Sequence, residues 1–475
     1  MEFDKDLQAR QEARQLCRQA AQAQVILGNM EQNQLDGIVA AVSKAFSKAA
    51  VELAQMAVEE TGFGNVEDKT VKNRFASDTV WEAIRDVKCV GLLKKQDQTK
   101  IWEIGVPVGL IGAIVPSTNP TSTVCYKAMI ALKAGNGIVF SPHPKAAACT
   151  VRAAQIVAEA AEKAGAPKGC VGCLRIPSMA GCRELMENEH VRLILATGGP
   201  AMVKAAYSSG KPAIGVGAGN GPAYIHRSAD VKQALKDIVR SKTFDNGTVC
   251  ASEQSILVEK DMAQDVVAQA QKMGCYFMDE DQADALAAKL FRADGAMNPG
   301  VVGKTAGELA KMAGFSVPTS TKVLVARADR VGVNAPYSHE KLCPVLGFYV
   351  EENEQAVLRR AMEILHHEGR GHTFSIHAGE EDVVARFAGQ IPVSRFLVNT
   401  PAALGGIGAT TSLFPALTLG CGAVGGSASS NNISPMDLIN IRRVAWGRDA
   451  VQNHRPKVDD NLVERLTEEI LKRLK

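Results

Sequence analysis

Residues 108–196 alternate between short apolar runs and longer helical patterns, and this alternation limits the possible folds more than any other feature. The run 108–116 is nearly continuously apolar and β-branched, which is typical of a strand buried on both faces. Further strands are predicted at 137–141, 172–175 and 191–196, and helices at 122–134, 145–164 and 179–187. This order predicts a parallel, doubly wound α/β sheet with helices on both of its faces.

The flanking sequence predicts further units. Apolar positions at helical spacing over residues 5–60 predict two or three helices, and 88–106 has the pattern of two strands joined by a polar turn at 96–98. The alternation restarts with a helix at 230–242, a strand at 255–258 and a helix at 262–273, which predicts a second α/β domain. Residues 433–447 are predicted to be a strand. The predicted division is 1–229, 230–430, 431–448 and 449–475.

Composition excludes several classes of partner. Among 475 residues, 54 are basic and 51 acidic, no long basic stripe occurs, and aromatic residues are only 5%, so a nucleic-acid surface is not expected. No apolar run reaches the roughly 18 residues that a membrane-spanning helix needs. The N-terminus has no basic segment followed by an apolar one, so no secretory signal is expected either. The sequence predicts a soluble, cytoplasmic protein.

The chain has eleven cysteines at irregular spacings, which favours free thiols in a reducing compartment. Cys170-x-x-Cys173, with Cys182 nearby, could form a zinc or redox site. A structural zinc site needs a second pair of ligands at similar spacing, and the sequence has none. We therefore expect no metal.

One cysteine differs from the others in its setting. Cys250 lies in the polar segment 243–253, which contains a glycine and precedes the β-branched run 255–258. A thiol at the mouth of a strand, on a flexible backbone, can be reached by a substrate. The sequence therefore indicates Cys250 as a candidate nucleophile.

Two loops follow predicted strands, at the place where open α/β sheets bind ligands. In 115–121, the side chain of Asn119 offers an N–H donor to a developing oxyanion, although an ordinary turn would use the same residue types. In 197–200, Gly198 and Gly199 would let a phosphate approach the backbone at a helix N-terminus. The segment 215–221 is rich in glycine, but the sequence after it does not have the strand-to-helix register of a Rossmann dinucleotide-binding turn. We expect its backbone to pack against a ligand or against the Cys250 loop.

Together these segments resemble the aldehyde dehydrogenase superfamily, and most closely its CoA-acylating branch. That branch includes the aldehyde dehydrogenase half of bifunctional aldehyde–alcohol dehydrogenases and the acetaldehyde and propionaldehyde dehydrogenases of bacterial microcompartments. The similarity runs from about residue 10 to about residue 447, and six segments carry it in order: 115–120, 141–145, 197–200, 243–253, 340–345 and 417–422. The resemblance implies a Rossmann-like cofactor domain, an α/β catalytic domain and a small β oligomerisation arm. It also implies a homodimer or homotetramer in which the strand pair near 90–106 associates with the strand near 433–447 of a neighbouring subunit.

The resemblance also implies roles for residues. Cys250 would attack the aldehyde, and Asn119, with the backbone N–H of Cys250, would form the oxyanion hole. Glu340 would hold the nicotinamide ribose. The full set implied for the nicotinamide cofactor is Val115, Pro116, Ser117, Thr118, Asn119, His143, Pro144, Gly198, Gly199, Val216, Gly217, Glu340 and Leu342. His143 and Pro144 stand where many relatives carry a lysine beside the adenosine ribose, and we expect NAD rather than NADP.

A departure from the family pattern predicts the acyl acceptor. Hydrolytic relatives carry a glutamate ahead of the cysteine, and here 215–218 matches that segment with Gly215 at the place of the glutamate. Glycine cannot act as a general base for water, so coenzyme A is expected to take the acyl group from Cys250. The predicted reaction is reversible: acetaldehyde or propionaldehyde, CoA and NAD⁺ give acyl-CoA and NADH by a ping-pong mechanism.

Alternatives remain open. The chain could be a hydrolytic dehydrogenase that forms a carboxylic acid, or an inert shell-associated component. Histidines at 366, 367, 372 and 377 fit a helix end followed by a loop and a strand. The loop 371–373 also resembles the acylating branch, which makes His372 a possible group for proton handling or CoA binding.

The C-terminal segment has a separate pattern. After a polar linker at 452–457, residues 459–475 predict a helix with acidic residues at its start and basic residues at its end. Its apolar stripe consists of Leu462, Val463, Leu466, Ile470, Leu471 and Leu474. The helix could dock on its own subunit or in a groove of a partner. It resembles an encapsulation peptide, which would place the enzyme in a bacterial microcompartment with a shell protein or a co-encapsulated enzyme as partner.

Overall fold

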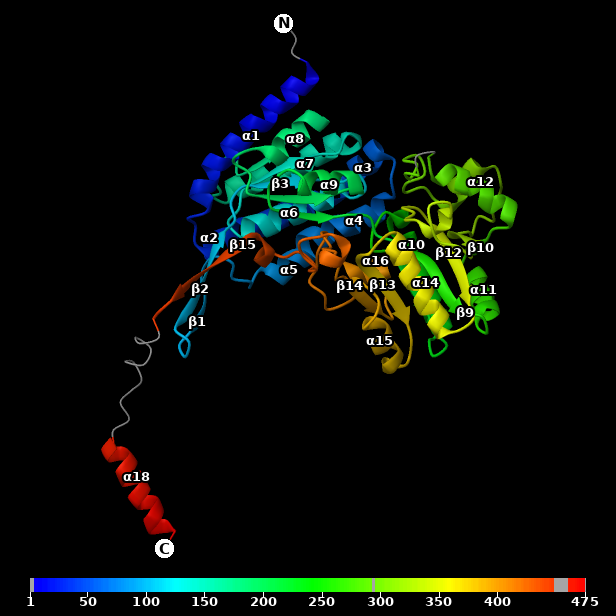
Figure 1. The fold of residues 1–475 in the computed structure, drawn as a ribbon. Coiled ribbons are helices and arrows are strands. Elements are labelled where there is room, and N and C mark those ends of the chain that lie inside the picture. Colours follow the sequence, from blue (N-terminus) through cyan, green and yellow to red (C-terminus); the bar gives the residue numbers. More distant parts are fainter. Residues whose placement is uncertain (1–3, 293–294, 448–459, 475) are drawn as a thin grey trace.

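The structure is a computed structural model that describes residues 4–292, 295–447 and 460–474 (Figure 1). The predicted linker at 452–457 lies outside these described residues. Three helices open the chain, as predicted: α1 (Lys5–Leu27), α2 (Gln32–Lys48) and α3 (Ala50–Thr61). Three helical segments that the sequence pattern did not predict follow: α4 (Val66–Arg74), the π-helical turn η1 (Phe75–Thr79) and α5 (Val80–Ile84).

A five-stranded parallel sheet forms the first α/β unit. Its strands, in the order β5-β4-β3-β6-β7, are β3 (Ile111–Ile114), β4 (Ile138–Ser141), β5 (Val171–Cys173), β6 (Leu193–Thr197) and β7 (Ala213–Val216). The connecting helices are α6 (Pro120–Lys133), α7 (Ala147–Lys163), α8 (Met179–Glu187) and α9 (Pro200–Tyr207), with a 3₁₀ turn η2 (Pro144–Ala146) before α7. The predicted doubly wound parallel sheet is confirmed.

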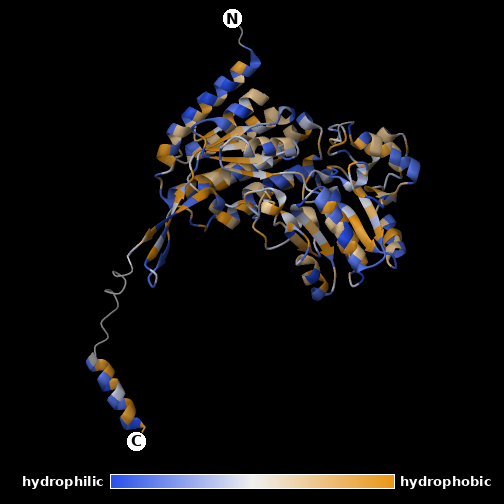
Figure 2. Ribbon diagram, viewed as in Figure 1, coloured by the Kyte–Doolittle hydropathy of each residue, from blue (hydrophilic) through white to orange (hydrophobic). Residues whose placement is uncertain are grey.

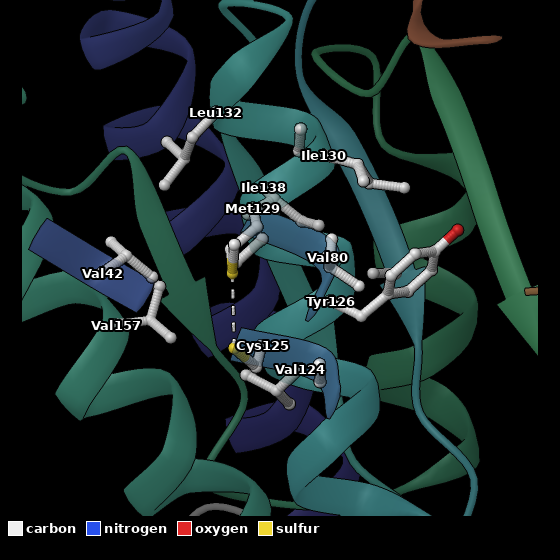
Figure 3. Packing of buried hydrophobic residues seen from close by; sticks show 14 of the residues in the cluster. Val42, Val80, Val124, Cys125, Tyr126, Met129, Ile130, Leu132, Ile138 and Val157 are labelled. Atoms are coloured by element: carbon white, nitrogen blue, oxygen red, sulfur yellow. Dashed lines mark hydrogen bonds between the residues drawn. The ribbon is translucent and has the colours of Figure 1, made fainter. Parts of the chain in front are cut away.

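Two hydrophobic clusters cover the two faces of this sheet. Alternate strand residues such as Ala113 and Leu195 pack with α2, α6 and α7, while Ile114 and Ala196 pack with α1 and α8. Helix α6 is buried along its whole length. Figure 3 shows its side chains, among them Cys125, whose Sγ lies 3.6 Å from Met129 Sδ. The sheet is therefore enclosed on both faces, which explains its continuously apolar strands.

A seven-stranded parallel sheet forms the second unit. In the order β10-β11-β12-β9-β8-β13-β14, its strands are β8 (Gly221–Ile225), β9 (Glu253–Glu259), β10 (Cys275–Phe277), β11 (Val323–Arg327), β12 (Val345–Glu351), β13 (Gly371–His377) and β14 (Val393–Val398). Its helices are α10 (Val231–Thr243), α11 (Ala263–Lys272), α12 (Glu280–Leu290), α13 (Ala306–Ala313), α14 (Glu354–His367), α15 (Glu381–Ala388) and α16 (Ala402–Gly406), and its 3₁₀ turns are η3 (Phe244–Gly247), η4 (Pro336–Ser338) and η5 (Ala423–Gly425). Helices α10 and α11 pack on one face, and α14 and α15 on the other. Because β8 already belongs to this sheet, the change of sheet falls between β7 and β8, ahead of the predicted boundary at 229.

A three-stranded antiparallel sheet projects from the body (Figure 1). It consists of β1 (Gly91–Gln96), a central β2 (Ile101–Pro107) and β15 (Ile439–Ala445). The strand near 433–447 was expected beside the 90–106 strands of a neighbouring subunit, whereas here β2 and β15 pair within one chain. The segment before β15, which includes η6 (Pro435–Leu438), is tied to the first unit: Asn136 Nδ2 donates to the carbonyl of Leu438 at 2.8 Å.

Helix α18 (Asp460–Arg473) stands clear of the other elements in Figure 1. Figure 2 shows hydrophobic and hydrophilic residues along this helix, and every side chain from 461 to 474 is exposed. The predicted helix is confirmed, and in this structure its apolar stripe does not pack on its own subunit. No helix within the described ranges is long and apolar enough to cross a membrane.

Candidate active site

The strand order places the predicted cofactor loops at one edge of the first sheet. Strands β3 and β6 are neighbours, and the chain winds away from them in opposite directions, so the loops after them flank the topological switch point. Val115, Pro116, Ser117, Thr118 and Asn119 follow β3, and Gly198 and Gly199 join β6 to α9. His143 and Pro144 follow β4, and Val216 ends β7 at the same edge. Since all five strands are parallel, these groups share the carboxyl edge of the sheet.

Cys250 follows a turn with an unusual backbone. Asp245, Asn246 and Gly247 have φ angles of 48°, 52° and 76°, and Asp and Asn are the non-glycine types that best tolerate this left-handed region. Glycine is required at 247 for a second reason, because a Cβ there would lie 2.9 Å from the backbone carbonyl of Cys343. The turn leads into β9 and leaves Cys250 half-buried at the mouth of the strand, as predicted.

The environment of Cys250 holds its thiol protonated. Burial raises its pKa to about 12, and the Glu340 carboxylate acts in the same direction, while Arg395 opposes them. At neutral pH the residue is a thiol, so attack on a carbonyl requires a group that accepts its proton.

Asn119 lies beside the Cys250 loop. It occupies the N-cap of α6, directly after the β3 loop, and its Nδ2 lies 3.3 Å from the carbonyl oxygen of Thr248. Its Oδ1 accepts a hydrogen bond from Lys72 Nζ. Two segments more than 100 residues apart are thus in direct contact, as the predicted pairing of Asn119 with Cys250 requires.

The glycine-rich segment 215–221 packs against the nucleophile loop, as predicted. A Cβ on Gly219 would overlap the carbonyl oxygen of Cys250 and would lie 3.3 Å from Cε1 of His372. The backbone N–H of Gly219 also donates to Glu340 Oε1 at 2.9 Å. Gly219 therefore joins Cys250, Glu340 and His372 in one site.

Gly219→Ala is expected to lower kcat by about 10- to 100-fold, because the new methyl group displaces the Cys250 backbone and misplaces the nucleophile by a fraction of an ångström to about 1 Å. Steady-state NADH formation from an aldehyde measures this loss. Gly37→Ala in α2 is the control, since a Cβ there meets nothing within 4 Å. Wild-type kcat in Gly219→Ala would show that the loop adapts without cost.

The structure changes the argument about the missing base. A Cβ on Gly215 would lie 2.6 Å from Val203 Cγ1 and 2.8 Å from Tyr207 Cε2, so this position faces α9 rather than Cys250. The segment that does contact Cys250, at Gly219, contains no carboxylate anywhere from 215 to 221. The absence of a glutamate therefore applies to the whole segment and does not depend on Gly215.

Glu340 is a further ionisable group of the site. Burial and the nearby Glu368 raise its pKa to about 8, within reach of working pH. Its loop is held by buried lysines: Lys242 Nζ donates to the carbonyl of Lys341 at 2.8 Å and to Gln254 Oε1 at 2.9 Å. The same loop carries Leu342, whose carbonyl accepts from the N–H of Gly303 at 2.8 Å.

His372 is fully buried beside Gly219. Its Nδ1 pairs with Thr373 Oγ1 at 2.8 Å, and its Nε2 has no hydrogen-bond partner within the described residues. Burial, with the nearby Arg395, lowers its pKa to about 3, so the imidazole is neutral at physiological pH. At neutral pH both groups are therefore largely uncharged, Glu340 as a protonated carboxyl group and His372 as a neutral imidazole.

A cavity of about 630 Å³ opens beside these groups, a size that suits a cofactor. It is bounded by α9, by the β7–β8 turn with the predicted Gly217, by the 365–370 loop and by 421–426. Lys204 and Arg370 bring positive charge to it. Its lining comes from both α/β units, so a ligand there would contact the carboxyl edge of the first sheet and the loops of the second.

Sequence reasoning missed two features of the site. These are the buried guanidinium of Arg395 and Lys72 behind Asn119. Lys72 lies in a short helix without a clear apolar pattern, where a buried lysine looks like a solvated one in the sequence. The spacing of Lys69 and Lys72, three residues apart on one helical face, was the available signal.

Comparison with known proteins identifies the family. The model of the "Aldehyde dehydrogenase family" matches residues 5–274. The bifunctional aldehyde-alcohol dehydrogenase of Escherichia coli (strain K12) is 43% identical over 90% of this chain. This chain spans only 49% of that relative, about half its length. The succinate-semialdehyde dehydrogenase (acetylating) of Clostridium kluyveri is 35% identical over 91% of this chain and 95% of its own length. The chain belongs to the aldehyde dehydrogenase family.

Solved structures agree with this assignment. An acetylating aldehyde dehydrogenase from Geobacillus thermoglucosidasius is 49% identical, with a TM-score of 0.92 over 94% of this chain and 98% of that one. A propionaldehyde dehydrogenase from Rhodopseudomonas palustris, solved with bound CoA and an acylated cysteine, is 28% identical, with a TM-score of 0.83 over 91% and 97%. One from the fucose utilisation microcompartment of Clostridium phytofermentans is 29% identical, with a TM-score of 0.83 over 92% and 97%. The predicted aldehyde dehydrogenase fold is confirmed.

Proposed function

We propose that this chain is a CoA-acylating aldehyde dehydrogenase that converts a short-chain aldehyde, CoA and NAD⁺ into acyl-CoA and NADH, and the reverse. One observation carries the proposal: Cys250 is enclosed by Asn119 and by a glycine segment that lacks a carboxylate for activating water. The names of the similar proteins, acetylating dehydrogenases and one with bound CoA and an acylated cysteine, support the same acceptor.

Separate residues have separate roles in the first half-reaction. Cys250 adds to the aldehyde carbon as a thiolate, and its proton passes to solvent. The Asn119 amide and the backbone N–H of Cys250 hold the oxyanion of the hemithioacetal. Gly198, Gly199 and the cavity beside Gly217 would hold the dinucleotide, and Glu340, with Leu342 in the same loop, would hold its nicotinamide ribose. A bound nicotinamide cofactor supplies the hydride acceptor, and NAD is the form proposed here.

The second half-reaction transfers the acyl group. After the hydride has left, Cys250 carries a thioester, and the CoA thiolate attacks it with the same oxyanion hole in place. The cavity with Lys204 and Arg370 would take the phosphate-bearing cofactor first and CoA afterwards. Acetaldehyde and propionaldehyde are the proposed substrates.

NADH formation from acetaldehyde or propionaldehyde, with and without CoA, tests the function. Turnover that requires CoA and yields acyl-CoA is expected. Turnover that ignores CoA and yields the free acid would identify the chain as a hydrolytic dehydrogenase. If neither product forms and an aldehyde analogue fails to label Cys250, the chain is the inert shell-associated component instead.

We also propose that the chain forms a homodimer or homotetramer through the arm of β1, β2 and β15. The sheet order leaves β15 with one edge unpaired by any described strand, and its residues 440–443 are exposed. Unpaired strand edges associate readily with other chains. Sedimentation of the intact protein measures the mass of the assembly, and a monomer at micromolar concentration would contradict the proposal.

Helix α18 is proposed to bind a microcompartment shell protein or a co-encapsulated enzyme. Its apolar stripe is exposed and its helix stands apart from the active-site units. A similar protein comes from a bacterial microcompartment, which supports this placement.

Deletion of residues 460–475 is therefore expected to leave kcat and KM within about twofold of the full chain, because α18 contacts none of the site residues. Co-sedimentation with assembled shells measures the second expected result, loss of association. Leu466→Glu provides a point variant of the same face. Unchanged association in both variants would contradict the role of α18.

A further inference from the structure

A cluster of buried charges lies directly behind Asn119. Lys69, Lys72 and Asp245 have side chains that are only 3%, 2% and 0% exposed. Both ammonium groups contact the same carboxylate oxygen of Asp245, Lys69 at 2.9 Å. The hydroxyl of Thr248 also donates to this oxygen, at 2.6 Å. Two helix residues of α4 are thereby joined to the turn that carries Cys250.

This cluster is not explained by fold stability. Burying ions is expensive, and apolar side chains of similar volume usually stabilise a fold as well or better. The half-buried carboxylate of Asp68, which accepts from the backbone N–H of Asp245 at 2.7 Å, is a second negative group near Lys72. Burial lowers the pKa of Lys72 to about 8, while the lysines hold the pKa of Asp245 below its ordinary value in spite of its burial. Four ionisable groups held together at this cost, directly behind Asn119, indicate a function at this position.

The hydrogen bonds of Lys72 define that function. An ammonium group only donates, so the partner atom of Asn119 must be its carbonyl oxygen, Oδ1. The NH₂ group of Asn119 is therefore forced to the opposite side, where Nδ2 lies 3.3 Å from the carbonyl of Thr248, two residues before Cys250. Without the lysine, the amide could rotate and present its oxygen, which would repel an oxyanion.

We propose that Lys72 is a positioning residue of the active site: it fixes the Asn119 amide with its NH₂ group toward the Cys250 loop and places positive charge behind the oxyanion hole. The inference rests on the proposed function of Cys250. Asp245 holds Lys72 in place, since its carboxylate is tied from both sides, by the lysines and by the backbone N–H of Asn65 at 2.9 Å. Lys69 also donates to the carbonyl of Thr118 at 3.0 Å and fixes the residue next to Asn119.

A double-mutant cycle between Lys72 and Asn119 tests the inference, read by the burst of NADH formation in a single turnover. Lys72→Met is expected to slow the burst by about 10- to 100-fold with little change in KM, because the lysine acts on the transition state through Asn119. In an Asn119→Ala background the same change is expected to cost less than about threefold. Lys72→Arg, which keeps the charge and donors, is expected to recover part of the rate.

Lys133→Met is the matched control. Lys133 is also a buried lysine of the first unit, paired with Asp36 at 2.6 Å, but it lies at the far end of α6 from Asn119. It is expected to lower the melting temperature without slowing the burst. If the rate losses of the two single variants multiply in the double variant, the two residues act independently and the inference is overturned. If Lys72→Met does not fold, Lys72→Gln in the same cycle gives the same two outcomes. Failure of the proposed function would be seen separately. If the reaction without CoA ends in free acid, the acylating function is wrong, but the double-mutant cycle still reports whether Lys72 acts through Asn119.

Discussion

Cys250→Ala is expected to reduce NADH formation by at least about 10⁴-fold, because Cys250 is the proposed carrier of the acyl intermediate. Cys250 is half-buried, its backbone carbonyl lies against Gly219, and Asn119 contacts the carbonyl of Thr248 two residues before it. Single-turnover and steady-state assays with a saturating aldehyde measure the loss. Cofactor binding is expected to persist, since the cavity lining does not include this side chain.

Cys173→Ala is the matched control for that experiment. Cys173 and Cys250 are the two cysteines that are not fully buried, and all eleven are free thiols. Cys173 lies on β5, the edge strand of the first sheet. Unchanged activity is expected in this control. Retention of more than about 1% of wild-type turnover in Cys250→Ala would show that another residue is the nucleophile.

Asn119→Ala is expected to lower kcat by about 10²- to 10³-fold, which is the usual effect of removing one donor of an oxyanion hole. KM for the aldehyde should change far less, because the oxyanion forms only as the thiol adds. Both half-reactions pass through such a state. The oxidation burst and the transfer of an acyl group from Cys250 to CoA should therefore slow by similar factors, as rapid-mixing assays of each step would measure.

Asn119→Asp sharpens this prediction. The substituted side chain has nearly the same shape and can still accept a hydrogen bond from Lys72, so folding should be preserved. It replaces the donor with a charged acceptor facing the oxyanion, and the loss should equal or exceed that of Asn119→Ala. Wild-type rates in Asn119→Asp would show that Asn119 has no role in the mechanism.

Local sequence patterns were sufficient to predict much of the fold. Burial on both faces of a parallel sheet makes its strands continuously apolar, and the run at 108–116 contains β3 for that reason. Helix α8 was predicted with its observed bounds, since its Ser178 N-cap and its apolar spacing are local features. Cys250 and Asn119 could be indicated from the sequence because each follows or precedes a buried strand in a polar loop, where parallel topology gathers ligands.

Other features depend on segments that are distant in the sequence. The partner of β2 could not be assigned to this chain or to a neighbouring one, because a strand edge is compatible with any strand of suitable register. The sequence indicated that the segment 215–221 packs against a ligand or the Cys250 loop, but not that Gly219 is the residue at which the Cys250 carbonyl leaves no room for a Cβ.

By itself, the sequence determined the alternation of strands and helices, which follows from periodicity, and it indicated Cys250 and Asn119 as the candidate nucleophile and oxyanion donor from residue types in loops. Only the tertiary structure decided which way the Asn119 amide faces and why Lys72 is buried. Hydropathy describes each residue alone, whereas the ion pairs of Lys72 and Asp245 form only when α4 and the turn before Cys250 are brought together.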